Sequence, residues 1–408
     1  MHPLSIPSPE VIDQIIDRHL DELVTVRRHL HANPELSWNE KETTNWLEAR
    51  LKSYGIASTR GPRSLGLVVD IGSAAPRVAV RGDIDAIPVD EQTDLPFKSQ
   101  SPGVMHACGH DAHATILLGT LVTIGELHKT GQLDSSVGIR GIFQPAEEVG
   151  QGASEMIDGG AISGIEAILA CHVDPSREVG RIGLKSGIQT AFCGEVFIEV
   201  NGAGGHSARP HETNDPVYAA TQLINSLYGH LPRKIDSRNP VVLSITRLEA
   251  GQTTNIIPAQ VKIGGTLRAL HEGAFETARE TVFQIVSAIE KMTGTEIRVE
   301  IPGKVPGVIN DPELIDAIAV SSSEFLGAEN IDTIPASVGG EDFAFYTREI
   351  RGALVRIGCG SETAGYFDLH SPFFTIDERA IRTGIGVLVR AFLEMALRLA
   401  ETGAVSKR

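Results

Sequence analysis

Cysteines and long apolar runs are scarce in this sequence. The four cysteines, Cys108, Cys171, Cys193 and Cys359, are spread over 408 residues without any Cys-x-x-Cys spacing. This usage is typical of a reducing compartment, so we expect a cytoplasmic protein with free thiols. The sequence has no run of about 18 apolar residues, which a membrane span requires. Residues 1–10 lack the basic and apolar regions of a secretory signal.

Basic residues are also in short supply. The chain has 36 Lys and Arg against 52 Asp and Glu, a net charge of −16, and no basic stripe. This balance argues against nucleic acid as a partner. A content of 41% hydrophobic and 22% charged residues is ordinary for a globular protein. A chain of this length exceeds what one hydrophobic core usually supports, so we expect two domains.

The order of the expected elements separates those two domains. Short strands at residues 67–71, 78–80, 137–143, 168–172 and 353–357 alternate with helical segments, which predicts an α/β domain with a central mixed sheet flanked by helices. Between them, residues 187–303 read as strand, helix, two strands, helix and strand, the order of a ferredoxin-like α+β sandwich. We therefore expect a first domain at 1–186 and 304–408 with the second inserted at 187–303.

One stretch concentrates side chains that can bind a transition metal. Residues 105–115 read MHACGHDAHAT and hold three histidines, one cysteine and one aspartate between His106 and His113. Cys108 and His110 flank Gly109, and on an extended or tightly turned loop this spacing directs both side chains to one side. A lone buried cysteine or histidine is more often structural. Burying so much polarity without a function is costly, so the cluster favours a metal site.

Further candidate ligands follow the expected strands. Asp83 and Asp85 come after the strand at 78–80, Glu147 and Glu148 after the strand at 137–143, and His172 ends the strand at 168–172. Acids and histidines past buried strands are typical of a site at the carboxyl edge of an α/β sheet, although a solvated loop would carry the same residues. In an extended segment adjacent side chains diverge, so one of the two glutamates can bind metal while the other faces substrate.

Five residues form the candidate ligand set. They are Cys108, His110, Glu148, His172 and His370. Thiolate and imidazole suit zinc, cobalt, nickel or manganese better than magnesium or calcium. Five ligands exceed the four of a structural zinc site, which suggests two ions with a shared ligand.

The motifs together resemble a known enzyme family. They occur at residues 105–115 (MHACGHDAHAT), 144–148 (QPAEE), 205–211 (GHSARPH), 254–258 (TNIIP) and 340–343 (GEDF), and at His370. In this order the chain resembles the amidohydrolase branch of the aminoacylase/carboxypeptidase metallopeptidase family. That branch includes hippurate hydrolases, N-acyl-amino-acid amidohydrolases and plant auxin-conjugate hydrolases.

The resemblance implies a site with two divalent metal ions in each subunit. The residue matching Cys108 bridges the ions, those matching His110 and His172 hold one, and those matching Glu148 and His370 hold the other. Relatives often carry a second histidine at Ser371, a departure that we expect to alter the pocket rather than the chemistry.

The resemblance also assigns the remaining site residues. Glu147 takes the place of the general base, and Asp85 serves the catalytic site by supporting a ligand. The inserted domain acts as a lid and dimerises, and its His206 reaches the partner's active site in a homodimer. Asn255 and Arg268 match substrate-contacting positions.

The expected reaction is metal-assisted hydrolysis of the amide bond in an N-acyl amino acid. Glu147 takes a proton from the attacking water and passes it to the leaving amine, while His206 stabilises the oxyanion. A dipeptidase or carboxypeptidase of the same mechanism would look alike. A cysteine hydrolase using Cys108 and His110 leaves Glu148, His172 and His370 without a role, and a non-catalytic metal-binding protein has no need of Glu147.

Overall fold

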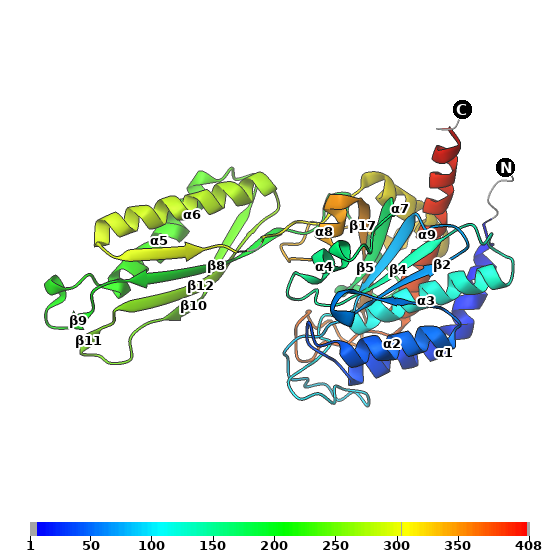
Figure 1. Ribbon diagram of the computed structural model, residues 1–408, viewed down its shortest axis with the longest axis horizontal. Helices are drawn as coiled ribbons and strands as arrows, with labels where there is room; N and C mark the ends of the chain where they lie inside the picture. The colour runs from blue at the N-terminus through cyan, green and yellow to red at the C-terminus, as the bar shows by residue number, and fades with distance from the viewer. Residues whose placement is uncertain (1–5, 303, 406–408) are drawn as a thin grey trace. The chain divides into compact units, whose positions relative to one another are not determined.

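The computed structural model describes residues 6–302 and 304–405, and the chain divides into two compact units (Figure 1). Unit 1 comprises Met1–Gln189, Val308–Pro335 and Asp342–Arg408, and unit 2 comprises Thr190–Gly307 and Ala336–Glu341. The expected end of the inserted domain at 303 lies outside the described residues, as do residues 1–5, on which part of the signal-peptide expectation depends.

Unit 1 contains an eight-stranded mixed sheet in the order β1-β2-β4-β3-β5-β17-β6-β16. Its central strands β3, β4, β5 and β17 run parallel, whereas β2 and β6 are antiparallel to their neighbours β4 and β17. The strand bounds are β1 Thr59–Arg60, β2 Leu67–Ile71, β3 Val78–Asp83, β4 Ile139–Gln144, β5 Ala167–Glu178, β6 Ile182–Leu184, β16 Ile331–Thr333 and β17 Arg351–Gly360. A separate pair joins β7 (Gly187–Ile188) to β15 (Ile309–Asn310). The predicted α/β fold with a mixed central sheet is confirmed.

Both faces of this sheet are covered. Alternate side chains of a strand point to opposite faces, so Val78 and Val80 join one hydrophobic cluster while Ala79 joins another. The helices of unit 1 are α1 Pro9–Ala32, α2 Lys41–Ser53, α3 His110–Lys129, α4 Gly152–Asp158, α7 Pro312–Leu326, α8 Ala344–Glu349 and α9 Arg379–Val405, with 3-10 turns η1 Pro62–Ser64 and η3 Ala328–Asn330. Helices α1, α3 and α9 pack against one another, and α3 and α9 also contact the sheet.

Unit 2 contains an antiparallel sheet in the order β10-β12-β8-β13, with β14 pairing beside β8. Its elements are β8 Phe192–Asn201, β9 Gly205–His206, η2 Pro210–Glu212, α5 Pro216–Lys234, β10 Val241–Glu249, β11 Ile256–Ile257, β12 Gln260–Ala269, α6 Glu272–Thr293, β13 Glu296–Glu300 and β14 Lys304–Val305. The inward side chains Val196, Ile198 and Val200 of β8 pack in a core that includes residues of α5 and α6. This is the ferredoxin-like order expected from the sequence.

Two kinds of helix start are seen. Asp215 and Asp311 precede α5 and α7, and each carboxylate accepts hydrogen bonds from two backbone amides of the first helical turn. Ser8 precedes α1, but its side chain makes no such bond. Of the described helices, none is long and apolar enough to cross a membrane.

Candidate metal centre and active site

The site lies at the carboxyl ends of the parallel strands of unit 1. Asp83 ends β3, Gln144 ends β4, and the segments that carry Asp85 and Glu148 follow these ends. His172 lies within β5, which continues to Glu178, and so does not end the strand as expected. The neighbouring strand β3 pairs with β5 only as far as Ala170, so His172 is at the height where β3 gives way to the site.

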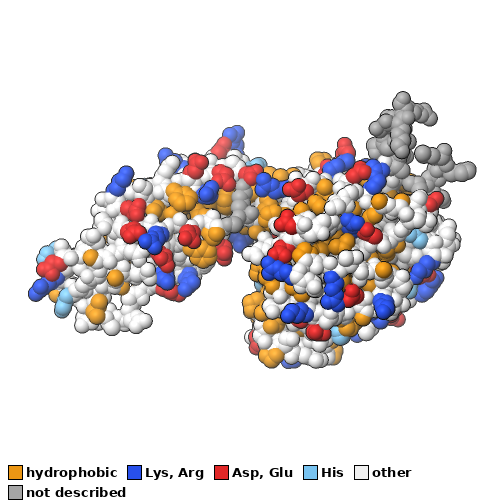
Figure 2. Space-filling model, in the orientation of Figure 1, with side chains coloured by type: hydrophobic (Ala, Val, Ile, Leu, Met, Phe, Trp, Pro, Cys, Tyr) orange, Lys and Arg blue, Asp and Glu red, His pale blue; other side chains and the backbone are white. Residues whose placement is uncertain are grey.

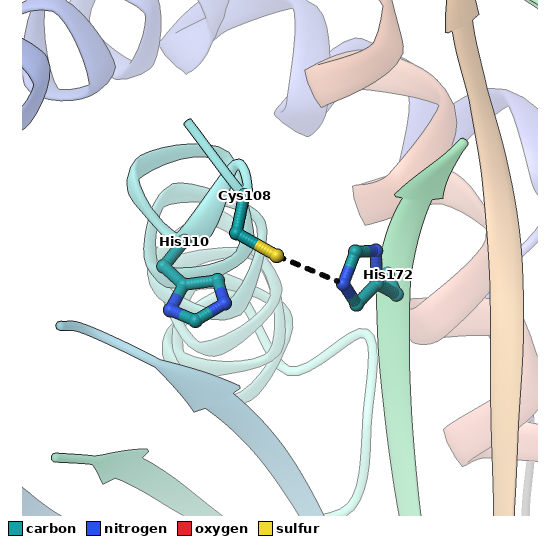
Figure 3. A group of neighbouring side chains, drawn as sticks. All are labelled: Cys108, His110 and His172. Atoms are coloured by element: carbon teal, nitrogen blue, oxygen red, sulfur yellow. Dashed lines mark hydrogen bonds between the residues drawn. The ribbon is translucent and has the colours of Figure 1, made fainter. Parts of the chain in front are cut away.

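Gly109 fixes the turn that presents Cys108 and His110. It has φ 87°, in the left-handed region, and an added Cβ would lie 2.4 Å from Cγ2 of Val173. Only glycine has both the conformational freedom and the lack of volume that this position requires. Helix α3 begins directly after it, so His110 is the first helical residue and Cys108 lies in the preceding turn (Figure 3).

All five expected ligands converge. Cys108 Sγ lies 3.5 Å from His172 Nε2 (Figure 3), and donor atoms of Cys108, His110 and His172 lie within 4.8 Å of one another. Donor atoms of Cys108, Glu148 and His370 form a second such group. Glu148 Oε1 is 3.7 Å from His110 Nε2 and 3.5 Å from His370 Nε2. Cys108 therefore belongs to both three-residue groups.

Hydrogen bonds orient the donor atoms of His110 and His172 so that they could bind a cation. His172 donates its Nδ1–H to the carbonyl of Val173 at 2.7 Å, which leaves the lone pair of Nε2 facing Cys108. His110 Nδ1 is held by Asp85 Oδ1 at 3.1 Å. Within the described part of the chain, the buried atoms His110 Nε2 and Glu148 Oε1 have no hydrogen-bond partner. Buried polar atoms rarely lack a hydrogen-bond partner, so a bound ion would account for these two. Two imidazoles, a thiol and a carboxylate form a donor set that suits transition metals.

The pKa shifts of Cys108 and His110 also favour a bound cation. Burial raises the pKa of the Cys108 thiol well above its ordinary value, and the carboxylate of Glu148 raises it further. Burial opposes protonation of His110, but the charge of Asp83 and the hydrogen bond with Asp85 hold its pKa well above the ordinary value. A bound cation would favour the thiolate and the neutral imidazole. Without one, Cys108 is a poor nucleophile, which argues against the cysteine-hydrolase reading.

The other members of the histidine-rich stretch have different surroundings. His113 donates Nδ1–H to Asp83 at 2.7 Å and accepts the amide of Val173 on Nε2 at 2.9 Å, so both ring nitrogens are engaged. Asp111 pairs with Arg27 at 2.7 Å in a buried ion pair. Burial lowers the pKa of His106 to about 4, and this histidine contributes to none of the ligand groups among described residues. The sequence indicated His110 and none of these three residues as a ligand, but it did not predict their different surroundings.

The segment after β4 is a turn, so the prediction of an extended segment is wrong. Gly150 donates its amide to the carbonyl of Glu147 at 2.7 Å and closes the turn. As a result both carboxylates approach His110 Nε2, at 3.9 Å for Glu147 and 3.7 Å for Glu148. Glu147 Oε1 also accepts the amide of Asp342 at 3.3 Å. The division of roles between the two glutamates therefore remains a prediction.

Asp85 connects three parts of the site. Its Oδ1 bonds His110 Nδ1, and its Oδ2 accepts the amide of Glu148 at 3.0 Å and the hydroxyl of Ser37 at 2.8 Å. Burial would raise the pKa of Asp85, but these hydrogen bonds and the charge of His110 lower it below the ordinary value. These contacts orient the ring of His110 and the backbone of the acidic turn, the turn that carries Glu147 and Glu148, which is the supporting role expected for Asp85.

Asp342, in the GEDF motif, was given no role from the sequence. Its carboxylate accepts hydrogen bonds from Arg81 at 2.8 Å, Gln144 at 2.9 Å and the amide of Ala153 at 2.9 Å. It thereby ties β3, the end of β4 and α4 together beneath the site. The motif is recognisable in the sequence, but the residues next to Asp342 in the sequence gave no indication of its distant hydrogen-bond partners.

The three expected site residues of unit 2 are not together. His206 is exposed and pairs with Ile256 across β9 and β11, and the carbonyl of Asn255 accepts the amide of Ser207 at 3.1 Å. Arg268 pairs with Cys193 at the start of β8 and donates to the carbonyl of Val338 at 2.9 Å. His206 follows the other end of β8. At about 3.3 Å per residue, a ten-residue strand places the two sites roughly 30 Å apart.

Comparison with known proteins identifies the family. The model of "Peptidase family M20/M25/M40" matches residues 79–394. The chain belongs to this family. It is 37% identical to N-acetyl-L-cysteine deacetylase of Bacillus subtilis over 95% of this chain and 90% of that protein. It is 35% identical to thermostable carboxypeptidase 2 of Saccharolobus solfataricus over 91% of this chain and 94% of that protein.

A solved structure supports the same assignment. The crystal structure of a protein from Bacillus subtilis described as a dinuclear metal-binding peptidase of the M20 family superposes with a TM-score of 0.79. It is 32% identical and covers 95% of this chain and 99% of its own. The predicted family and reaction class of this chain are confirmed. It is a metal-dependent amidohydrolase of the M20 family.

Proposed function

We propose that the protein hydrolyses N-acyl amino acids to a carboxylic acid and a free amino acid. The observation that carries this is the pair of three-residue donor groups that share Cys108, with the carboxylate of Glu147 beside them. The deacetylase relative is named for an N-acyl amino acid, which supports this substrate class. A carboxypeptidase reaction is the second candidate, because another relative is named a carboxypeptidase.

The ligand groups suggest where two metal ions would bind. Cys108 would be shared, His110 and His172 would complete one site, and Glu148 and His370 the other. The thiol and imidazole donors favour zinc, manganese, cobalt or nickel. Two such ions would supply Lewis acidity toward a water molecule and toward the substrate carbonyl.

The protein's own side chains would move the proton and orient the substrate. Glu147 takes a proton from the attacking water and gives it to the leaving amine. The amide of Ala208 donates to His206 Nδ1 at 3.1 Å, so the ring proton is on Nε2, where it can bond the developing oxyanion. Asn255 and Arg268 bind the polar ends of the substrate, the amino-acid carboxylate among them.

The separation within unit 2 supports a site shared by two subunits. A small N-acyl amino acid cannot span the length of β8, so His206 and Arg268 of one chain cannot both touch one substrate molecule. We infer that Arg268 serves its own subunit and that His206, with neighbouring Asn255, serves the partner of a homodimer.

The surface of unit 2 supports such a partner. Strand β10 lies at the edge of the sheet, where a second chain can pair or pack. Figure 2 shows orange hydrophobic surface on unit 2 between charged side chains. The exposed large hydrophobic residues of unit 2 are Phe197, Val217, Tyr218, Tyr228, Val242, Leu248, Ile256, Phe283, Met292 and Val338. The four free cysteines, three of them buried, support the expected cytoplasmic location.

A substrate panel tests the proposal. N-acetyl, N-benzoyl and longer N-acyl amino acids, with unblocked dipeptides for the carboxypeptidase alternative, are incubated with protein loaded with zinc, manganese, cobalt or nickel. Release of free amino acid from the acylated compounds, strongly reduced in Glu147→Gln, is the expected result. Cleavage of dipeptides alone would favour the second candidate, and cleavage of neither would contradict the proposed function.

A further inference from the structure

Ala146 has an unusual backbone conformation directly before the two glutamates of the site. Its φ is 54°, in the left-handed region that alanine rarely occupies. The residue is fully buried and joins the end of β4 to the turn of Glu147 and Glu148. A strained residue at such a place persists only when its surroundings hold it.

Glu40 supplies a contact that can hold it. Its buried carboxylate accepts the amide of Ala146 at 2.8 Å, across more than 100 positions of the chain. Burial raises the pKa of Glu40 to about 7, and the charge of Asp85 adds to this, while hydrogen bonds from backbone amides act in the opposite direction. A carboxyl group in such a place is costly to bury, which calls for a compensating role.

The same region braces the turn at further points. Ser37, three residues before Glu40, donates its hydroxyl to Asp85, and Asp85 in turn accepts the amide of Glu148. The carbonyl of Ala146 accepts the amide of Gly152 at 3.1 Å. The amides on both sides of Glu147 are therefore anchored, one by Glu40 and one by Asp85.

We propose that Glu40 is a positioning residue that holds Ala146 in its left-handed conformation and so directs Glu147 and Glu148 toward the site. The hydrogen bond needs an acceptor rather than a charge. The activity readout rests on the proposed function, whereas the exchange readout below does not.

Four variants separate this role from simple packing. Glu40→Leu removes the acceptor and should lower kcat by about 10- to 100-fold with little change in KM, because the base is misplaced. Glu40→Gln keeps an acceptor oxygen and should remain close to wild type. Ala146→Gly should be nearly neutral, because glycine adopts this φ without strain. In the double variant Glu40→Leu/Ala146→Gly, the glycine should restore most of the lost activity.

Hydrogen exchange gives an independent readout. It is measured on chelator-treated protein, so neither turnover nor bound metal enters. Glu40→Leu should speed exchange at the Ala146 amide, and Glu40→Gln should not. If Glu40→Leu does not fold, Glu40→Met, with an unbranched apolar chain, replaces it in both measurements.

Glu35 provides the matched control. Its carboxylate accepts the amides of Glu42 and Thr43 at the start of α2, and among the described residues it makes no hydrogen bond with residues 146–148. Glu35→Leu should destabilise the protein without a gain from Ala146→Gly. The proposal is overturned if Glu40→Gln is as impaired as Glu40→Leu, or if Ala146→Gly gives Glu40→Leu no benefit. A wild-type protein inactive on the whole panel would contradict the proposed function, while the exchange result would still decide the role of Glu40.

Discussion

The expected site residues of unit 1 and those of unit 2 differ in how they are held. In unit 1, His110 and His172 are buried and each is oriented by a hydrogen bond on its second ring nitrogen. In unit 2, His206 and Asn255 are exposed, and their described contacts lie within the two-stranded β9–β11 pair and the turn after His206. The candidate ligands of unit 1 are thus fixed by contacts within that unit, whereas His206 and Asn255 of unit 2 are left exposed.

Buried, fixed side chains and exposed side chains suit different tasks in an enzyme. Preorganised buried donors suit a centre that must keep its geometry during each turnover. Exposed donors on a separate unit can reach the substrate after it binds, which suits closure of the site. The predictions below test the contrast from the largest expected effect to the smallest.

Removal of metal should abolish the activity that depends on unit 1 and leave the structure of unit 2 unchanged. A chelator should abolish hydrolysis, because no side chain replaces the Lewis acidity at the donors around Cys108. Elemental analysis of the loaded protein should find about two transition ions per chain. Hydrogen exchange in α5 and α6 should stay unchanged. A protein free of metal yet fully active would contradict the assignment.

Substitution of each of the two neighbouring glutamates in turn should show which one is the general base and which one binds metal. Glu147→Gln should lower kcat by roughly 10²- to 10⁴-fold, the span for a lost general base, while metal content is retained. Glu148→Gln should lose metal as well, since its carboxylate lies beside His110 and His370. Equal loss of metal in both variants, measured by elemental analysis, would show that the roles are misassigned.

Mixed dimers should reveal which residues act across the subunit boundary. His206→Ala should lower kcat by about 10²- to 10³-fold with metal retained, as when an oxyanion donor is removed. A hybrid of one Glu147→Gln subunit and one His206→Ala subunit has one site with both residues intact. Activity should therefore return, up to about half of the sites in each hybrid dimer.

Arg268 is the control for that experiment. If it serves its own subunit, a hybrid of Glu147→Gln with Arg268→Ala has no complete site and should stay inactive. Verified His206 hybrids that show no recovery would place His206 in its own subunit or outside catalysis. Recovery in the Arg268 hybrid would contradict the inference from the length of β8.

The sequence predicted the fold, which the structure confirms, and a set of five candidate ligands, which the structure brings together. Strand and helix order sufficed for a mixed sheet and a βαββαβ unit, and the clustered motif drew attention to Cys108 and His110. The sequence favoured His110 over His113 through its spacing to Cys108 and through the family resemblance, but it gave no account of what His113 contacts instead. Their difference arises from Asp83 and Val173, which only the folded chain brings to His113.

The acidic turn was mispredicted for a related reason. Ala146 is not a residue type that indicates a left-handed turn, so the segment before Glu147 read as extended. The partner that compensates for this conformation, Glu40, lies in a distant helix start with no local sign of a role. Long-range hydrogen bonds of this kind leave no periodic trace in a single sequence.

The smallest expected effect concerns two helix starts, one in each unit. Asp215 accepts the amides of Val217 and Tyr218 at the start of α5, so Asp215→Ala should cost about 1 kcal/mol of stability in unit 2. Ser8 makes no such bond before α1, so Ser8→Ala should change stability little. Hydrogen exchange in α5 and α1 measures both. Because the donor set is held within unit 1, neither variant should alter metal content, and a loss of metal in Asp215→Ala would show that the two units are not independent in this respect.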